Sequence, residues 1–557
     1  LRRTMPATEI DMTRSLLAFI LFALTFPLAA EPPAELQPAL AAITPEGISA
    51  RMRFLADDLL EGRGTGTRGY DIAARYVASE FEELGLEPLF NGEWLQPVPF
   101  RLSTIEEAFM VITSGRGIRR LVWGEDFVSS GHPAKTSGAI SAPVVYAGYG
   151  ITAPELERDD YASVDVEGKI VAILRGAPSS FPNHLRTYYS STSGKRDNAL
   201  AHGAAGILFF QTPSEAKRFP YDRARQHAKE PSVSWLQDDG LPHGERGRLV
   251  LEAAISQSGA EHLFVGSGRP LSEILDDAER GETESIELPA TLSFTQKSRH
   301  ALATRPNVGA VLRGNRLPDE AFVYVAHLDH VGVVPNGDDS IYNGAYDNAS
   351  GIAAMLEVAR AFTAAPRRPD RSIIFLAVTA EEKGLLGAEY FTHHPPLPIE
   401  NIVGNVSLDM FLMLHPLRDI VAYGAEHSTL GPAVERAAAM IGARVSPDYA
   451  PEEVIFIRSD QFRFVQKGIP SMMLSAGTDT GDPDLDGRAA IKQWLSERYH
   501  RAGDDMSQPM VFEAGAAFAR INFLLGWDVA NAEERPRWNE GDFFGMKFGG
   551  NAGQRSR

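Results

Sequence analysis

Short apolar runs bounded by polar residues recur along the second half of the chain. Such runs are typical of strands that are buried on both faces of a sheet. Four strands are predicted in this way, over 322–326, 373–378, 403–408 and 471–474. Apolar residues at helical spacing over 352–362 predict a helix between the first two. Strands that alternate with helices predict an α/β fold, with a mixed, mostly parallel sheet covered by helices on both faces.

The first half of the chain has a different pattern of predicted helices and strands. Helical spacing of apolar residues predicts a helix over 72–84, and short strands are predicted over 144–146, 169–174 and 206–210. We interpret the region of short strands as a β-rich inserted domain that ends near the acidic stretch 276–287. The expected organisation is a signal peptide at 12–30, the N-terminal part of the main domain at 40–136, the inserted domain at 137–290, the main part of the large domain at 293–530, and a flexible tail at 531–557.

Residues 12–30 have the features of a secretory signal. A charged Arg14 precedes an apolar stretch over 16–26, and small residues follow up to Ala30. The stretch is too short for a comfortable membrane span, although an uncleaved anchor is the alternative. We therefore expect a secreted or periplasmic protein with no stable membrane span after signal removal.

The composition of the chain limits the number of domains, the partners and the metal ligands that can be expected. A chain of 557 residues is too long for one ordinary domain. The formal net charge of -19 argues against nucleic acid as a partner, because phosphate backbones are bound by concentrated Lys and Arg. The chain contains no cysteine, so a transition metal must be held by His, Asp and Glu.

Five side chains suited to metal binding are spaced along the second half. They are His327, Asp347, Glu382, Asp409 and His500. The first four stand at the end of an apolar run or open the helix that follows one, so the backbone can bring them to one rim of the sheet. Two histidines and three carboxylates suit a pair of zinc ions with one bridging carboxylate and a shared water, which becomes a hydroxide near neutral pH.

Neighbouring residues suggest a division of labour. Glu381 and Glu382 are adjacent and cannot easily serve one metal in the same way, so one can ligate while the other acts as a general base. Asp329 lies two residues after His327 at a predicted strand end, and its carboxylate can orient that imidazole. A solvated acidic turn is the alternative for the glutamate pair.

An ordered set of motifs resembles peptidase family M28, the zinc aminopeptidases, and specifically its secreted bacterial members with an inserted protease-associated (PA) domain. The motifs are His-x-Asp, Asp-Asn-x-Ser-Gly, Ala-Glu-Glu-x-Gly-Leu-x-Gly, Leu-Asp-Met, Arg-Ser-Asp-x-x-x-Phe and Tyr-His. The resemblance extends from the Glu-Gly-Arg loop at Glu61 to about Trp527. It implies a zinc aminopeptidase-like catalytic domain, with the segment 137–290 as the PA domain.

The resemblance also implies roles for individual residues. Asp347 would bridge two zinc ions, His327 and Asp409 would hold one ion, and Glu382 and His500 the other. Glu381 would be the catalytic base, Asp329 the orienter of His327, Tyr499 a hydrogen-bond donor to the oxyanion, and Arg458 a substrate-binding residue. The chain departs from many relatives at Gln461, where they have His.

The function implied is hydrolysis of the N-terminal bond of peptide substrates by a metal-bridging hydroxide. A carboxypeptidase of the same superfamily would need cationic groups for a substrate carboxylate, and Arg458 is the one obvious candidate. A non-catalytic, receptor-like homologue would have no need of the retained ligands and Glu381. The remaining histidines His330, His393 and His394 are not needed for the metal set, and the calcium-like sequence that starts at Asp482 is interpreted as a solvated acidic loop.

Overall fold

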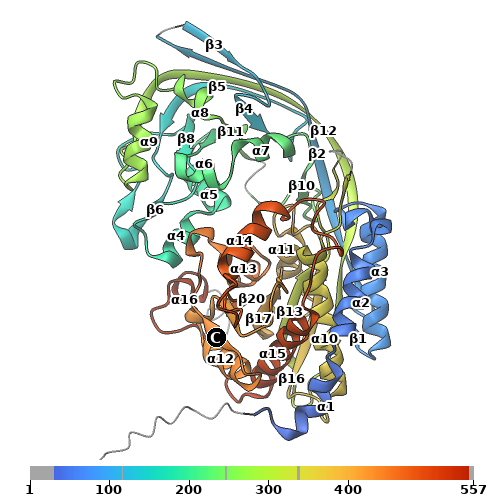
Figure 1. The fold of residues 1–557 in the computed structure, drawn as a ribbon. Helices are drawn as coiled ribbons and strands as arrows, with labels where there is room; N and C mark the ends of the chain where they lie inside the picture. The colour runs from blue at the N-terminus through green and yellow to red at the C-terminus, as the bar shows by residue number, and fades with distance from the viewer. Residues whose placement is uncertain (1–30, 116, 245–247, 335–338, 551–557) are drawn as a thin grey trace, which may run out of the picture.

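The computed structural model describes residues 31–115, 117–244, 248–334 and 339–550. It has two lobes, and the lower lobe in Figure 1 contains the central sheet with most of the long helices. The signal peptide expected at 12–30 lies outside the described residues. Within the described ranges, no helix is both long enough and apolar enough to cross a membrane.

The lower lobe is built on a mostly parallel sheet. Its central strands are β13 (Leu317–His327), β16 (Arg371–Val378), β17 (Ile402–Leu408) and β20 (Ser471–Ala476). β13 lies parallel to both β16 and β17, and β17 lies parallel to β20. β18 (Asp419–Tyr423) is antiparallel to β20, and β12 (Ile286–Leu312) is antiparallel to β16. The four strands and the mixed, mostly parallel sheet that the apolar runs predict are thus confirmed.

Alternate side chains of these strands pack on opposite faces of the sheet. Tyr324 on β13 joins one core with α10 (Ser350–Ala364) and α15 (Phe512–Asn531). Val325, the next residue, joins a second core with α11 (Leu386–His393) on the other face. Both faces are therefore covered by helices, which explains why the strands are apolar throughout rather than alternating.

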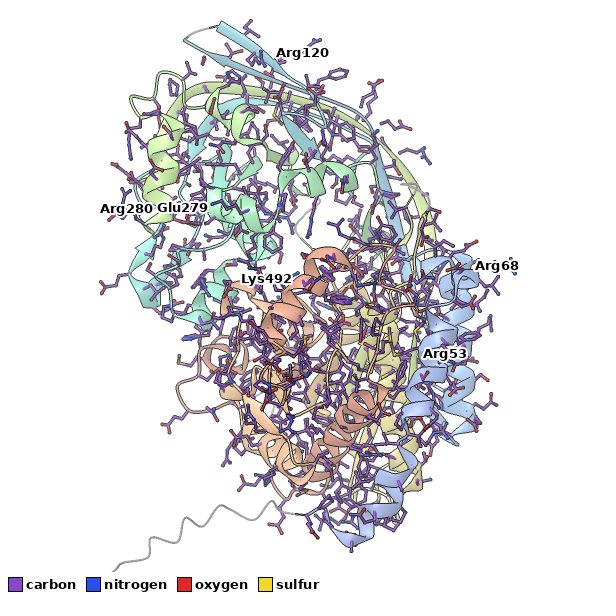
Figure 2. All side chains as sticks on the ribbon, in the orientation of Figure 1. Arg53, Arg68, Arg120, Glu279, Arg280 and Lys492 are labelled. Atoms are coloured by element: carbon purple, nitrogen blue, oxygen red, sulfur yellow. The ribbon has the colours of Figure 1, made fainter. Side chains whose placement is uncertain are left out.

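Two further helices form the outer side of the first of these cores. They are α2 (Pro45–Leu55) and α3 (Arg68–Glu83), and α3 confirms the predicted helix over 72–84. Figure 2 shows Arg53 and Arg68 projecting from the outer side of this helix layer, whereas Arg51 of α2 is buried and pairs with Glu357 of α10. Their apolar residues contribute to the core instead, so these helices are amphipathic in the expected sense.

The upper lobe contains the other half of the same sheet, which continues from the lower lobe through β12 (Ile286–Leu312). Its strands are β4 (Phe127–Ser129), β5 (Ser137–Tyr146), β8 (Ile170–Leu174), β9 (Gly206–Phe210) and β11 (Leu251–Ile255). β5, β8, β9 and β11 are parallel in that order, and β4 closes the edge in the antiparallel direction. Separate clusters of buried apolar residues cover the two faces of this sheet.

Two long strands join the lobes. β2 (Leu95–Ser114) and β12 pair antiparallel along most of their length and run from one lobe into the other (Figure 1). β12 pairs with β5 in the upper lobe and with β16 in the lower lobe. The expected boundary between 290 and 293 therefore falls inside a continuous strand.

The segment after Asn531 does not form the loose tail that its composition predicts. It contains α16 (Phe543–Phe548), in which Phe544 is fully buried. Trp538 donates from Nε1 to the carbonyl oxygen of Gly468 at 2.8 Å, and the Phe543 ring lies 5.3 Å from the Tyr188 ring of the upper lobe. The prediction is wrong for residues 532–550 because aromatic burial outweighs the polar composition.

Candidate metal centre

Four of the predicted ligands lie at the carboxyl ends of the parallel strands. His327 is the last residue of β13, Asp409 directly follows β17, and Glu382 lies on the loop after β16. Asp347 lies in a short helical turn (Ala345–Ala349) that leads into α10. Ligands of open α/β sheets bind at this rim because the loops that follow the strands meet there.

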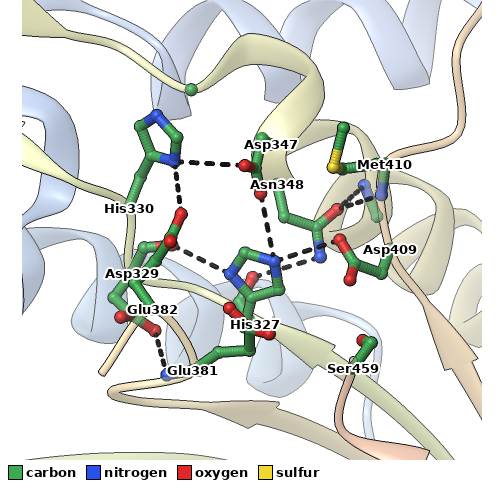
Figure 3. A network of polar contacts seen from close by, with 12 residues as sticks. His327, Asp329, His330, Asp347, Asn348, Glu381, Glu382, Asp409, Met410 and Ser459 are labelled. Atoms are coloured by element: carbon green, nitrogen blue, oxygen red, sulfur yellow. Dashed lines mark hydrogen bonds and ion pairs between the residues drawn. The ribbon is translucent and has the colours of Figure 1, made fainter. Parts of the chain in front are cut away.

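His327, Asp347 and Asp409 form a first cluster. Nε2 of His327 lies 3.1 Å from Oδ1 of Asp409 and 3.2 Å from Oδ1 of Asp347. Figure 3 shows the imidazole between the two carboxylates. All three side chains are buried, and their nitrogen and oxygen atoms are close enough together to hold one metal ion.

His500 brings a second histidine to the other side of Asp347. It follows α14 (Gly487–Glu497), and its Nε2 lies 3.1 Å from Oδ2 of Asp347 and 3.2 Å from Oε2 of Glu382. Asp347 thus turns one carboxylate oxygen to each histidine. The five predicted ligands are brought together, with Asp347 at the centre of the set.

His330, which the sequence does not require for the set, lies directly beside it. Its Nδ1 lies 2.9 Å from Oε1 of Glu382 and 3.7 Å from Oδ2 of Asp347, and the side chain is fully buried. His330, Asp347 and Glu382 could also hold a metal ion. The sequence analysis found His330 unnecessary for the metal set, and the spacing His-x-Asp-His was the signal that could have placed it beside the set, because it puts two histidines on one strand-end segment.

Asp329 orients His327 through its main chain rather than through its carboxylate. Nδ1 of His327 lies 3.0 Å from the backbone oxygen of Asp329. A carbonyl can only accept, so Nδ1 carries a proton, and Nε2 is the atom that faces the carboxylates of the cluster. The Asp329 carboxylate instead accepts from the amide of Glu381 at 3.1 Å and from the hydroxyl of Thr65 at 2.8 Å. The chain turns after His327, which directs this carboxylate to the loop after β16.

Two buried residues that no motif identified hold the turn around Asp347. The carboxylate of Asp504 accepts from the amides of Tyr346 and Asp347, at 2.9 and 3.1 Å. Arg63, from the glycine-rich loop before α3, donates to the carbonyl oxygens of Asn343 and Gly344 at 2.7 and 2.9 Å. The central position of Asp347 in the set therefore depends on contacts from distant parts of the chain.

The site carries more buried negative than positive charge. Burial raises the pKa of Glu381 well above its usual range, and the neighbouring Glu382 raises it further. Burial by itself would lower the pKa of His327, but the Glu381 and Asp409 carboxylates raise it well above the usual range. Protons are thus drawn into the cluster, which is what closely spaced carboxylates do when no other cation neutralises them.

The predicted catalytic and substrate-binding residues surround this set. Glu381 precedes the ligand Glu382, and the Tyr499 ring lies 3.9 Å from the ring of His500. Burial raises the pKa of Tyr499 to about 12. Arg458 donates to the backbone oxygen of Glu453 at 3.3 Å and lies over the ring of Phe219 from the upper lobe, 5.7 Å from its centroid.

The other singled-out residues lie away from the ligands. Gln461 is buried and donates to the carbonyl oxygen of Phe456 at 2.8 Å, so it supports the chain just before Arg458. The rings of His393 and His394 lie 5.5 Å from the ring of Trp235. The acidic loop at 482–486 is exposed, and Asp486 accepts from the amide of Ala489 as the cap of α14. Among the described residues, this loop forms no group that could hold a metal ion.

The fold and the site define an α/β protein with two adjoining metal-ligand clusters on the rim of its sheet. Residues 307–522 match the family model described as "Peptidase family M28", and residues 140–241 match the one described as "PA domain". Residues 307–522 therefore form a region of the peptidase family M28 type, and residues 140–241 form a PA domain. The match to the PA domain lies in the upper lobe, between β5 and the segment that follows β10 (Ser232–Trp235).

Individual relatives agree with this assignment. A probable zinc metalloprotease of Pyricularia oryzae is 35% identical over 102 residues, which are 18% of this chain and 20% of that protein. Aminopeptidase YwaD of Bacillus subtilis is 26% identical over 267 residues, which are 48% of this chain and 43% of that protein. The chain thus spans between a fifth and a half of the curated relatives it matches.

A solved structure shares the fold over nearly the whole chain. The aminopeptidase from Aneurinibacillus sp. strain AM-1 superimposes with a TM-score of 0.52 and 18% sequence identity. The match covers 90% of this chain and 100% of that one. Both lobes therefore belong to the shared architecture.

Proposed function

We propose that this chain is a zinc-dependent peptidase that removes the N-terminal residue of peptides. The observation that carries the proposal is the carboxylate of Asp347, which lies 3.2 Å from His327 and 3.1 Å from His500 through different oxygens. A carboxylate with one oxygen on each side is the ligand that a pair of metal ions shares. The names of the relatives, zinc metalloprotease and aminopeptidase, support the same reading.

The donor set suits zinc. Imidazole nitrogens and carboxylate oxygens are its ordinary ligands in a chain without cysteine. The buried Nε2 of His500 makes no hydrogen bond of good geometry within the described residues, as expected of an atom directed at a metal. His327, Asp347 and Asp409 would hold one ion, and Asp347, Glu382 and His500 the other. Bound zinc would lower the pKa of a water molecule and polarise the scissile carbonyl group.

Glu381 is proposed as the general base. It lies next to the ligand Glu382, and its amide is held by Asp329 at 3.1 Å, so its main chain is fixed relative to β13. A carboxylate next to the metal-binding residues is placed to accept the proton of the attacking water. Tyr499 is proposed to donate from its hydroxyl to the oxyanion, since its high pKa keeps it protonated at neutral pH.

An aminopeptidase fits better than a carboxypeptidase. Arg458, the cation that a substrate carboxylate would need, is already 3.4 Å from the Glu453 carboxylate. A receptor-like homologue would gain nothing from buried, mutually repelling carboxylates. Export is part of the proposal and rests on the signal-like segment at 12–30.

The test combines metal analysis with two variants. Purified protein should contain about two zinc ions per chain and lose activity reversibly on chelation. Glu381→Gln should keep the zinc and lose several orders of magnitude in turnover, whereas Asp347→Ala should lose zinc. Reporter peptides with a free amino terminus should be cleaved, and matched peptides with a blocked amino terminus should not. Full activity in a zinc-free preparation would refute the proposal.

A further inference from the structure

Glu381 and Glu382 lie on a loop whose backbone is not in its preferred conformation. We call residues 380–386, between β16 and α11, the glutamate loop. Ala380 and Leu385 have φ angles of 55° and 61°, in the left-handed region that disfavours residues with a side chain. Short backbone bonds close the turn, from the amides of Gly384 and Leu385 to the carbonyl oxygen of Glu381. Contacts from outside must help to hold such a loop in place.

Strand β10 of the PA domain packs against both ends of this loop. Val233 and Trp235 on β10 form one buried apolar cluster with Ala380 and Leu386. Trp235 is 2% exposed, so the indole is enclosed between the two lobes. Figure 1 places β10 directly above α11, which begins at the end of the glutamate loop. The PA domain is thus in contact with the residues that flank Glu381.

A chain of polar contacts continues from the same tryptophan into the loop. Nε1 of Trp235 donates to Oε2 of Glu389 at 2.8 Å, and Oε1 of Glu389 is paired with Arg463 at 2.9 Å. Arg463 in turn donates from Nη2 to the carbonyl oxygen of Gly384 at 2.9 Å. The Trp235 indole therefore fixes the Glu389 carboxylate. That carboxylate positions the Arg463 guanidinium, which holds the glutamate loop.

A second contact reaches the residue after the glutamate pair. Nζ of Lys383 lies 3.1 Å from Oε2 of Glu230, which is also in the PA domain. On the opposite side, Asp329 accepts from the amide of Glu381. The loop is held from the metal-binding side by Asp329 and from the PA-domain side by Glu230 and Trp235.

We propose that β10 and Glu230 of the PA domain position the glutamate loop, and that Trp235 is a positioning residue for the base Glu381. The role of Glu381 as the base rests on the proposed function. Trp235 touches no ligand in the described structure, so it acts through Glu389, Arg463 and the Gly384 carbonyl. The inserted domain is accordingly part of the active site and not only a separate module.

Hydrogen exchange tests the contact without relying on catalysis. In the zinc-loaded full chain, Trp235→Phe should keep the ring packing and lose the bond to Glu389. Amides of residues 380–386 should then exchange about ten-fold faster. A hydrogen bond to a charged acceptor stabilises the closed loop by enough to change its opening equilibrium about ten-fold. Trp123→Phe is the matched control, since Trp123 packs on the upper-lobe core and has no bonded partner for Nε1 among the described residues. Equal exchange in the wild type and Trp235→Phe would overturn the proposal.

Kinetics and charge reversal test the consequence. Trp235→Phe should lower kcat about three- to thirty-fold with KM and zinc content nearly unchanged, because a displaced base affects the chemical step. Glu230→Lys should act in the same direction, and the double variant Glu230→Lys/Lys383→Glu should restore most of the loss. Faster exchange with unchanged kcat would overturn the positioning role. A wild-type chain without peptidase activity would refute the proposed function, while the exchange rates would still decide whether the PA domain holds the loop.

Discussion

Asp504 offers a test of how Asp347, the proposed bridging ligand, is held. Its carboxylate is fully buried, and its two oxygens divide their partners. Oδ1 accepts from the amide of Tyr346 at 2.9 Å and from Nε2 of Gln508 at 3.0 Å, and Oδ2 accepts from the amide of Asp347 at 3.1 Å. The substitution Asp504→Asn keeps the size and shape of the side chain. It replaces one acceptor oxygen by an NH2 group, which must then face an N–H donor.

The geometry sets which bond is lost and how much it matters. An asparagine that keeps its oxygen on Tyr346 and Gln508 satisfies two donors and points its NH2 at the amide of Asp347. The bond to Asp347 is then lost, together with the charge assistance of the other two. Hydrogen bonds to charged groups contribute about 1.5–3 kcal/mol each. A free-energy change of about 1.4 kcal/mol alters a dissociation constant tenfold. If zinc binding must reorder the turn, loss of one such bond therefore weakens zinc binding by roughly 10- to 150-fold. Supporting residues of metal sites have effects of about this size, 10–100-fold.

Zinc affinity measured by competition with a chromogenic chelator checks this expectation. Asp505→Asn is the matched control, because Asp505 is the neighbouring residue and its carboxylate only accepts from the amide of Ser507 at 2.7 Å. Asp504→Asn should bind zinc more weakly than both the wild type and this control. The metal-free forms should be compared by thermal melting to separate metal binding from folding. Equal zinc affinity in all three proteins would refute the assignment of Asp504 as the support of Asp347.

Two further predictions concern catalysis and pH. Tyr499→Phe should lower kcat roughly ten- to a thousand-fold with KM and zinc content little changed, because the oxyanion appears only after attack; an unchanged kcat with a lowered melting temperature would assign Tyr499 to packing. Burial lowers the pKa of Lys195 in the PA domain to about 7, so protonation opposes folding below that pH. The free energy of unfolding should therefore rise as the pH increases from about 7 toward the ordinary lysine value of about 10.4, and Lys195→Met should flatten this rise in melts recorded across that range. An identical pH dependence in both proteins would contradict it.

The residues at the rim of the sheet could be predicted because each buried parallel strand appears in the sequence as one short apolar run. β16 and β17 end at Val378 and Leu408, and the apolar runs predict both ends at the same residues. Hydrophobic runs bounded by polar residues therefore locate the strand ends directly. Since the loops after these strands carry Glu382 and Asp409, the pattern of apolar runs is sufficient to place both ligands at one rim of the sheet.

The long connecting strands were not predictable in the same way. The first part of β12 alternates between buried and exposed positions, and its inward side includes the polar residues Gln296 and Ser298. The alternation of Ile286, Leu288, Ala290, Leu292 and Phe294 with mostly polar residues is the local signal of a half-buried strand, but it does not identify the strand that pairs with it. Pairing with β2 over a large sequence separation is what makes these residues a strand, and such pairing has no local signal.

The residues that support the site were missed for a related reason. Asp504 and Arg63 act on backbone amides and carbonyl groups, so their partners in the sequence have no characteristic side chain. His330 was visible in the sequence, and its position three residues after His327 was the one local sign that set it apart from the other histidines. Long-range contacts to the main chain are recognised only when the fold brings the segments together.

Backbone conformation at the ligands explains why supports from distant segments are needed. Ala380, Met410 and His500 have φ angles of 55°, 51° and 54°, and each is a ligand or lies within two residues of one. A left-handed conformation costs a residue with a side chain about 1–2 kcal/mol. Without other contacts, the backbone at these three residues would relax to a more favourable conformation. Strained conformations of this kind are common where a site must be preorganised. The strands place the ligand loops, whereas Asp504 and Arg63 hold the turn at Asp347, and the PA domain packs against the strained loop at Ala380.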